Sequence, residues 1–231
     1  LTGQFWVMHY GGMITIIDPV DNTSSKITYG KDLLDFKKAP EKVNIFLPIF
    51  QNLEGIWFEV FSNSRSFFVH YQFAKKSFTY HDGQFNDSEN PMPYEPNFYK
   101  MIEDQTGLLW LATRPNFYKQ AVKSRRMSLF RHNAESALSI PSDTIYHLLE
   151  DSHNRIWIGT QSGISVEISQ DQFEQYYFRD AKGKKSGLGD INKIYEDKKG
   201  QIWVGSNDYG LLRLNEISRE FEHYTVKSEI T

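Results

Sequence analysis

The sequence contains no cysteine, and this absence excludes a disulfide framework and any metal site with Cys ligands. It also lacks an apolar run of the ~18–20 residues that a transmembrane helix needs, and no segment has the pattern of a signal peptide. No charge of either sign dominates, since 26 Lys and Arg stand against 29 Asp and Glu. This near balance gives no overall attraction to nucleic acid or to an anionic membrane surface.

What the composition does contain suits a folded protein. Hydrophobic residues make up 39% of the 231 residues and aromatic residues 15%, enough for a globular core. The chain opens at Leu1 without an initiator methionine. We therefore expect it to be a piece of a longer protein, with any targeting signal or membrane anchor outside it.

An internal repeat dominates the sequence. All five tryptophans stand at one position of this repeat, at residues 6, 57, 110, 157 and 203, so that successive copies are roughly 46–53 residues apart. The clearest copies are Leu148–Thr160, Ile194–Ser206 and Met101–Thr113, and weaker ones are Ile49–Trp57 and Gly3–Val7. Tryptophans in one phase, with similar neighbours, predict a repeat architecture.

Each copy has the pattern of four short strands. An alternating run such as Ile191–Tyr195 is the first, and a Glu-Asp-x-x-Gly turn leads to the second, which carries the tryptophan. In that turn we expect Asp to accept hydrogen bonds from nearby backbone N–H groups and Gly to adopt positive φ. The third strand is typified by Gly210–Leu214 and the fourth, aromatic one by Phe221–Tyr224.

Four strands in about 45 residues, repeated, predict an all-β fold of the β-propeller type. We expect 1–231 to be a partial propeller of about five four-stranded blades, and part of a larger one. The first blade lacks its opening strand, so further blades or a second copy would have to complete the ring. The expected blades are about 1–36, 43–82, 97–133, 142–179 and 189–225.

The full pattern Ile-x-x-Ile-x-Glu-Asp-x-x-Gly-x-Ile-Trp-Ile-Gly-Thr-x-x-Gly-Leu resembles the two-component regulator propeller repeat. The match is strong over 142–225, good over 97–113 and degraded over 1–82. In that family seven-bladed propellers form the periplasmic sensor region of hybrid two-component systems from gut Bacteroidetes such as Bacteroides. Two segments depart from the pattern, Gln51–Gly55 and Ala112–Phe117, and we favour drift over pocket specialisation as the reason.

The resemblance implies the function and partners of the whole receptor. It implies a periplasmic sensor region of an inner-membrane protein, whose membrane span and histidine kinase lie outside this segment. The implied ligand is an oligosaccharide, the implied assembly is a homodimer of the full-length receptor, and no nucleic-acid contact is implied in this segment.

Chemistry-bearing residues give no catalytic pattern. The acidic pairs Glu103-Asp104, Glu150-Asp151 and Glu196-Asp197 could act as general acids or bases, but their recurrence in each blade favours a structural role. No P-loop or nucleophile elbow is present. We expect no catalytic residue, metal or cofactor. The histidines lack metal-ligand spacing; they are His9, His70, His81, His132, His147, His153 and His223.

A ligand is expected on the propeller face formed by the turns between second and third strands and by the links between blades, where side chains vary. Amides, Arg, Asp and aromatic rings there suit a sugar. The candidate ligand-binding residues are His9, Tyr10, Asn63, Arg65, Arg114, Asn116, Gln161, Asn207, Asp208 and Tyr209. A basic cluster is expected to be a solvated blade edge and comprises Lys119, Lys123, Arg125 and Arg126.

Two alternatives remain open. A propeller enzyme, such as a polysaccharide lyase or glycosidase, would need carboxylates or a Tyr, His and Arg set converging on the axis, and the pairs Asp208 with Tyr209 and His9 with Tyr10 are the hints of it. A scaffold propeller would bind a protein partner through a large exposed apolar patch.

Overall fold

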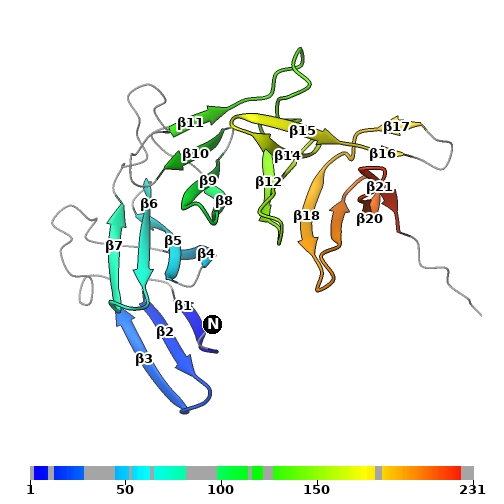
Figure 1. The fold of residues 1–231 in the computed structure, drawn as a ribbon. Coiled ribbons are helices and arrows are strands. Elements are labelled where there is room, and N and C mark those ends of the chain that lie inside the picture. The colour runs from blue at the N-terminus through cyan, green and yellow to red at the C-terminus, as the bar shows by residue number, and fades with distance from the viewer. Residues whose placement is uncertain are drawn as a thin grey trace, which may run out of the picture. The chain divides into compact units, whose positions relative to one another are not determined.

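The computed structural model describes residues 3–9, 13–28, 45–51, 54–62, 65–81, 98–113, 116–121, 127–179 and 184–224. Regular structure in these ranges is entirely β-strand, arranged in five sheets (Figure 1). None of these residues forms a helix that could cross a membrane. Contacts divide the chain into two compact units, Leu1–Asn97 and Phe98–Thr231, which we describe separately. The division of 1–231 into the five blade ranges given above stays a prediction.

The first unit holds two antiparallel sheets in which consecutive strands are neighbours. The first sheet has three described strands, β1 (Phe5–His9), β2 (Met13–Asp18) and β3 (Thr23–Thr28). The second sheet has four, β4 (Ile45–Gln51), β5 (Gly55–Ser62), β6 (Arg65–Gln72) and β7 (Ser77–His81). Alternation along β2 buries Ile14 and Ile16, which join Phe58 and Val69 of the second sheet in one hydrophobic cluster.

The second unit holds three sheets of the same order, from the first strand to the fourth. Their strands are β8 (Phe98–Glu103), β9 (Leu108–Thr113), β10 (Phe117–Ala121), β11 (Met127–Phe130), β12 (Ile145–Glu150), β13 (Ile156–Thr160), β14 (Gly163–Ser169), β15 (Gln172–Tyr176), β18 (Ile191–Glu196), β19 (Ile202–Ser206), β20 (Gly210–Asn215) and β21 (Glu220–His223). Sheets contact their successors through their first strands, since β12 packs on both β8 and β18. Four-stranded antiparallel sheets that converge on their first strands are the arrangement of propeller blades.

The core of the second unit lies between successive sheets. Trp157, completely buried, and Tyr176 of one sheet pack in the same cluster as Ile194, Val204 and Phe221 of the next. Each such side chain contributes roughly 1.5–3 kcal/mol on burial. The repeated tryptophan is therefore an anchor between sheets, as the sequence predicts, and not an exposed stacking platform.

The turn before each tryptophan is built around one aspartate. In the fourth blade, Asp151 Oδ1 accepts hydrogen bonds from the backbone N–H groups of His153 and Arg155, both at 2.9 Å. Asp151 Oδ2 accepts a hydrogen bond from Trp157 Nε1 at 2.7 Å. Asn154 at the end of the turn has a φ of 63°, and it stands where the other copies have glycine.

The same bonds recur in the neighbouring blades. Trp110 Nε1 donates to Asp104 Oδ2 at 2.8 Å, and Trp203 Nε1 donates to Asp197 Oδ2 at 2.9 Å. Gly107 and Gly200, with φ of +78° and +77°, close these two turns. The expected structural role of these aspartates is confirmed.

The glutamates of the acidic pairs join one blade to the next. Glu150 Oε1 accepts a hydrogen bond from the backbone N–H of Gln105, in the turn of the preceding blade, at 3.1 Å. Glu196 repeats this contact one blade later, because its carboxylate accepts from the N–H of Ser152 at 2.8 Å and from the Ser152 hydroxyl. In both pairs, the aspartate therefore binds the turn of its own blade and the glutamate binds the turn of the preceding blade.

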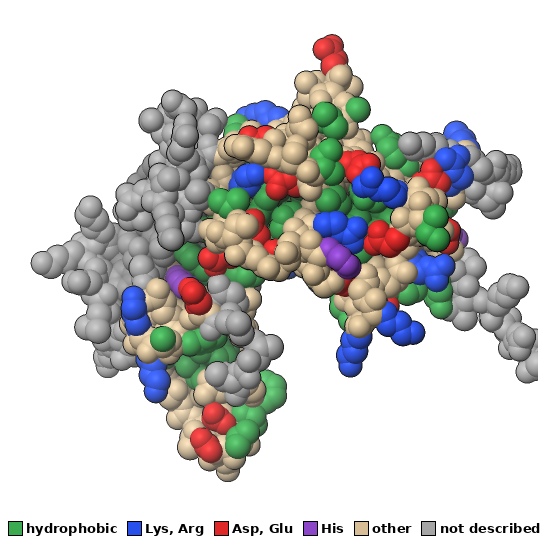
Figure 2. Space-filling model, in the orientation of Figure 1, with side chains coloured by type: hydrophobic (Ala, Val, Ile, Leu, Met, Phe, Trp, Pro, Cys, Tyr) green, Lys and Arg blue, Asp and Glu red, His purple; other side chains and the backbone are tan. Residues whose placement is uncertain are grey.

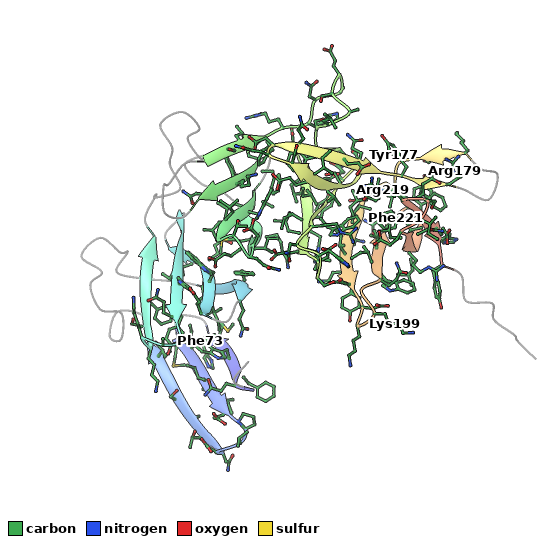
Figure 3. The ribbon with its side chains drawn as sticks, viewed as in Figure 1. Phe73, Tyr177, Arg179, Lys199, Arg219 and Phe221 are labelled. Carbon is green, nitrogen blue, oxygen red and sulfur yellow. The ribbon has the colours of Figure 1, made fainter. Side chains whose placement is uncertain are left out.

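The link after the fourth blade adds two strands that the sequence pattern did not predict. Strand β16 (Phe178–Arg179) pairs in parallel with β21, and β17 (Lys185–Ser186) pairs with β16, which makes a six-stranded sheet. Arg179 forms an ion pair with Glu220 at 2.6 Å, and the Phe221 N–H donates to the Tyr177 carbonyl at 2.9 Å (Figure 3). The link thus covers the outer edge of the fifth blade.

The fourth and fifth blades differ in how their second strands are covered. Every residue of β13 is buried, whereas β19 buries Ile202, Val204 and Ser206 but leaves Trp203 half-buried. Strand β13 therefore has neighbours on both faces, while the tryptophan face of β19 is open in the described chain. An apolar groove of about 410 Å³ lies on that face, and its lining includes exposed Tyr195, Leu211 and Tyr224.

Replacing Asp151 by alanine tests how much the turn contributes. We expect Asp151→Ala to lower the free energy of unfolding by about 3 kcal/mol, because the buried Trp157 N–H and two backbone N–H groups lose their acceptor. Glu216→Ala is the control, since the exposed Glu216 binds the same Arg155 without serving the turn, and we expect less than about 1 kcal/mol. Urea unfolding measures both, and equal losses would contradict the assignment.

The charge of Asp151 should also appear in the pH dependence of stability. Burial acts against the charged form, but hydrogen bonds from Trp157 and Arg155 outweigh it and lower the pKa of Asp151 below its usual value. The stabilisation is then complete above the unfolded pKa of about 3.9 and is lost as the pH falls through the lower folded pKa. We expect the stability difference between the native chain and Asp151→Asn to shrink between pH 6 and pH 2, as measured by urea unfolding. A difference that stays constant over this range would argue against the charged hydrogen bonds.

Candidate functional site

The described residues include part of the predicted ligand face. Tyr10, Asn63 and Arg114 lie outside the described residues, and Arg65 is described only by its backbone in β6. The ligand contacts predicted for these four residues stay predictions.

Three other predicted residues stand in separate local environments. His9, at the end of β1, has its Nε2 2.9 Å from Thr15 Oγ1 on β2. Asn116 is only 6% exposed, and it hydrogen-bonds to Tyr118, whose pKa is raised by burial in spite of that bond. Gln161 is exposed in the turn between β13 and β14. Of the three, the side chain of Gln161 is the most accessible to a ligand.

The remaining three predicted residues form one turn, between β19 and β20, that is tied to the preceding link. Asn207 donates from its backbone N–H to the Asp190 carbonyl at 2.9 Å and from Nδ2 to Asp190 Oδ2 at 3.1 Å. Asn207 Oδ1 accepts a hydrogen bond from Asn192 Nδ2. The Tyr209 hydroxyl lies 3.1 Å from Ser186 Oγ. The turn and the link therefore fix one another.

The contact between this turn and the link depends on a close approach of the Gly189–Asp190 backbone to the Asp208 side chain. Asp208 Oδ2 accepts the Asp190 N–H at 3.0 Å, and the chain reaches this position through Gly189, whose φ is +66°. A Cβ on Gly189 would lie 1.9 Å from Asp208 Oδ2, so only glycine fits there. The Ser206 hydroxyl also joins the turn to the link, because Oγ accepts a hydrogen bond from the Asp208 N–H at 3.1 Å and donates one to the Leu188 carbonyl at 2.7 Å.

We call this set of side chains the link cluster; its members are Asp190, Asn192, Asn207, Asp208 and Tyr209. The turn that carries Gln161 adjoins the link, because the Ser162 carbonyl would lie 3.4 Å from a Cβ on Gly187. Asp190 Oδ1 is buried and accepts no hydrogen bond from any described residue. A buried carboxylate oxygen without a donor is costly, and a ligand hydroxyl would satisfy it. The cluster is rich in acceptors and suits a ligand that carries hydroxyl groups.

Sequence reasoning missed two members of the cluster, Asp190 and Asn192, and also Ser186, whose hydroxyl lies beside that of Tyr209. The links between blades were expected to face the ligand, but the candidates came mainly from the turns. The available signal was position, because Asp190 and Asn192 flank the first residue of β18 and so lie where a link enters a blade.

The environment of Lys119 differs from the one expected for the basic cluster. Lys119 is the one member of that cluster whose side chain the structure describes. Lys119 was expected on a solvated edge, yet its side chain is only 12% exposed and forms ion pairs with Glu167 and Asp171 of the next blade. Its Nζ also lies 4.8 Å from the centre of the Trp110 ring. A cation that pairs with carboxylates and an aromatic face can be buried, so the solvated-edge prediction is wrong for Lys119. The other members, Lys123, Arg125 and Arg126, lie outside the described residues.

The pair Asp208 and Tyr209 gains no catalytic partner in the described parts of the chain, and the pair His9 and Tyr10 stays a prediction because Tyr10 lies outside them. Asp208 and Tyr209 are engaged in the structural contacts given above, and no described group of three His, Asp or Glu side chains could hold a metal ion. On the visible surface of the second unit, positive and negative side chains are interspersed, without a large patch of one sign (Figure 2). The geometry suits binding through hydrogen bonds.

Comparison with known proteins gives one family match. The model of the two component regulator propeller matches residues 139–162 and 187–208. These ranges include the aspartate turns of the fourth and fifth blades, Gln161, and the link cluster residues Asp190, Asn192, Asn207 and Asp208. No curated protein sequence matches the chain.

Solved structures resemble the chain in fold. The extracellular domain of a protein described as a hybrid two component system of B. thetaiotaomicron is 15% identical, with a TM-score of 0.63 over 99% of this chain and 28% of that one. PorZ, a surface component of the type-IX secretion system of Porphyromonas gingivalis, is 16% identical, with a TM-score of 0.63 over 98% of this chain and 33% of that one. The allergen Mala s 1 of Malassezia sympodialis is 12% identical, with a TM-score of 0.53 over 98% of this chain and 76% of that one.

The chain spans a third or less of the length of the first two of these structures. Identities this low establish the fold alone, and the fold class expected from the sequence, an all-β propeller, is confirmed. The number of blades in the whole protein stays a prediction. On this β-propeller fold the chain carries two-component regulator propeller repeats, as its sequence pattern predicts.

Proposed function

We propose that this chain is part of the extracytoplasmic sensor region of a hybrid two-component receptor. The matched repeats support this proposal, since they are named for two-component regulators. So does the similarity in fold to an extracellular domain of that class of protein. The segment itself would then recognise a ligand and catalyse nothing, while a membrane span and a histidine kinase elsewhere in the protein would carry the signal.

The ligand that we propose is an oligosaccharide, bound at the link cluster. The observation that carries this proposal is the buried Asp190 Oδ1, which has no hydrogen-bond donor in the described chain and stands beside the amides of Asn192 and Asn207. Carboxylate and amide oxygens accept hydrogen bonds from sugar hydroxyls, and the Tyr209 ring offers a neighbouring apolar surface.

Signalling requires the ligand to bind one state of the receptor more tightly than another. The link cluster lies where one blade meets the next, so a ligand there would contact both Asp190 of the link and Asp208 of the following blade. We propose that the full-length receptor is a homodimer and that the bound ligand changes the pairing of its two sensor regions. A periplasmic location follows from the same proposal.

A second proposal concerns the open face of the fifth blade. Tyr195 and Leu211 are 55% and 44% exposed there, although their counterparts in the fourth blade, Leu149 and Ile164, are covered by the fifth. We propose that a further blade of the same repeat covers this face in the whole protein. A binding site for another protein, as in a scaffold propeller, is the alternative that an apolar face of this kind would also fit.

The ligand proposal is tested by calorimetry of the chain against a panel of plant and host oligosaccharides. We expect one class to bind, with Asn207→Ala weakening the affinity about tenfold through the loss of one or two hydrogen bonds. Gln172→Ala is the control, because Gln172 is an exposed amide at the start of β15, outside the cluster.

Three outcomes of this test would count against the proposal. No binding by any oligosaccharide would remove the glycan ligand, and equal losses in the two variants would remove the link cluster as its site. Release of cleaved product from the panel would favour the polysaccharide lyase or glycosidase instead.

A further inference from the structure

Three basic side chains occupy the same position in three successive blades. Lys100, His147 and Lys193 each follow the irregularity in the first strand of their sheet. Each pairs with a small residue two places after the tryptophan, and these partners are Ala112, Gly159 and Gly205. The first strands β8, β12 and β18 pack side by side (Figure 1), so the three basic groups lie at one level on neighbouring strands.

The imidazole in the middle of this row is buried without hydrogen bonds. His147 is 7% exposed, and neither Nδ1 nor Nε2 has a hydrogen-bond partner among the described residues. An imidazole always carries at least one N–H donor, so leaving both nitrogens unpaired in the interior is costly. A polar site of this kind usually has a bound partner, such as a water molecule or an ion.

The electrostatic surroundings of His147 are positive. Burial, followed by the charges of Lys193 and Lys100, lowers the pKa of His147 to about 3. Burial and the charge of Lys193 likewise lower the pKa of Lys100. The charges that act on His147 are those of these two lysines, and Lys193 itself is exposed and lines the groove on the open face of the fifth blade. A Cβ on Gly159, the strand partner of His147, would contact Ile191 and Ile194 of the fifth blade. Within the described residues, no carboxylate forms an ion pair with either lysine.

We propose that Lys100, His147 and Lys193 form a binding site for a small oxyanion on the first strands of the third, fourth and fifth blades. The two ammonium groups would donate to the anion, and His147 would take up one proton from solvent and donate as an imidazolium. Binding thus supplies both the missing hydrogen-bond partner and the missing negative charge. The site is separate from the link cluster, and it does not depend on the glycan proposal.

The same chemistry could come from a free inorganic anion or from the acidic group of a charged sugar. Sulfate and glucuronate are therefore the two probes. We expect sodium sulfate to bind in calorimetry at constant ionic strength against a chloride background, more tightly at pH 5 than at pH 7 because a proton is taken up. Lys100→Met and Lys193→Met should each weaken sulfate about tenfold, since each removes a charged donor while it keeps most of the apolar stem.

The pKa of His147 gives a second measurement, which added anion would not change if the three residues had only a structural role. In the chain with ¹⁵N-labelled histidine, the signal lost in His147→Gln identifies this imidazole. We expect added sulfate to raise its pKa by at least two units, because an anion favours the charged ring. Lys199→Met is the control, since this exposed lysine lies in the turn between β18 and β19, and it should leave both readouts unchanged.

The outcomes separate the possibilities. Sulfate binding that depends on Lys100 and Lys193 supports the site. Stronger binding of glucuronate than of sulfate, with the same dependence, would identify a sugar acid as the ligand. Absence of binding by either anion, or binding that the lysine variants leave unchanged, would overturn the proposal, as would a His147 signal that does not respond to anions.

Discussion

The hydrogen bond from tryptophan to the turn aspartate six residues earlier sets the geometry of the third, fourth and fifth blades. It fixes the indole in a single orientation, with its polar edge satisfied inside the blade and its apolar face turned to the neighbouring sheet. In that orientation Trp157 packs against both Tyr176 and Phe221, whose ring centres lie 5.0 and 6.3 Å away. The packing between blades therefore depends on a polar contact within one blade, because a misplaced indole would fill the interface badly.

Side chains differ most between blades at the positions that take no part in the aspartate–tryptophan hydrogen bond. The links and the turns between second and third strands carry no part of the aspartate–tryptophan geometry, so their side chains are free to differ from blade to blade. The fourth blade has Gln161 in this turn, whereas the fifth has Asn207, Asp208 and Tyr209 joined to Asp190. A rigid repeating frame with variable connections is a common way to build a specific binding surface.

Much of this could be predicted from the sequence, because the repeat reports what each blade needs for itself. The phase of the tryptophans predicts five sheets, and the Asp and Gly of the turn predict its backbone bonds. Contacts between blades could not be predicted in this way, because the sequence of one repeat does not show which atoms of the next blade lie close to it. The bond from Gln105 to Glu150, the burial of Lys119 by Glu167 and the parallel pairing of β16 with β21 all join groups 43 or more residues apart. The same limit hid Asp190 and the row of basic groups around His147, which exist only once blades are placed side by side.

The hydrogen bonds between blades that the glutamates accept all run the same way, from one blade to the turn of the blade before it. The turns around Asp104 and Asp151 each receive a carboxylate from the blade that follows, so these blades reach their full local stability only after their successors have folded. The turn around Asp197 receives no such carboxylate from the described chain, and Asp197 is itself less buried than Asp151. In a nearest-neighbour array, opening starts at the unit with the fewest neighbours and travels inward. Fraying is therefore expected to begin at the fifth blade, and any structure that packs on its open face would raise the stability of the blades before it as well as its own.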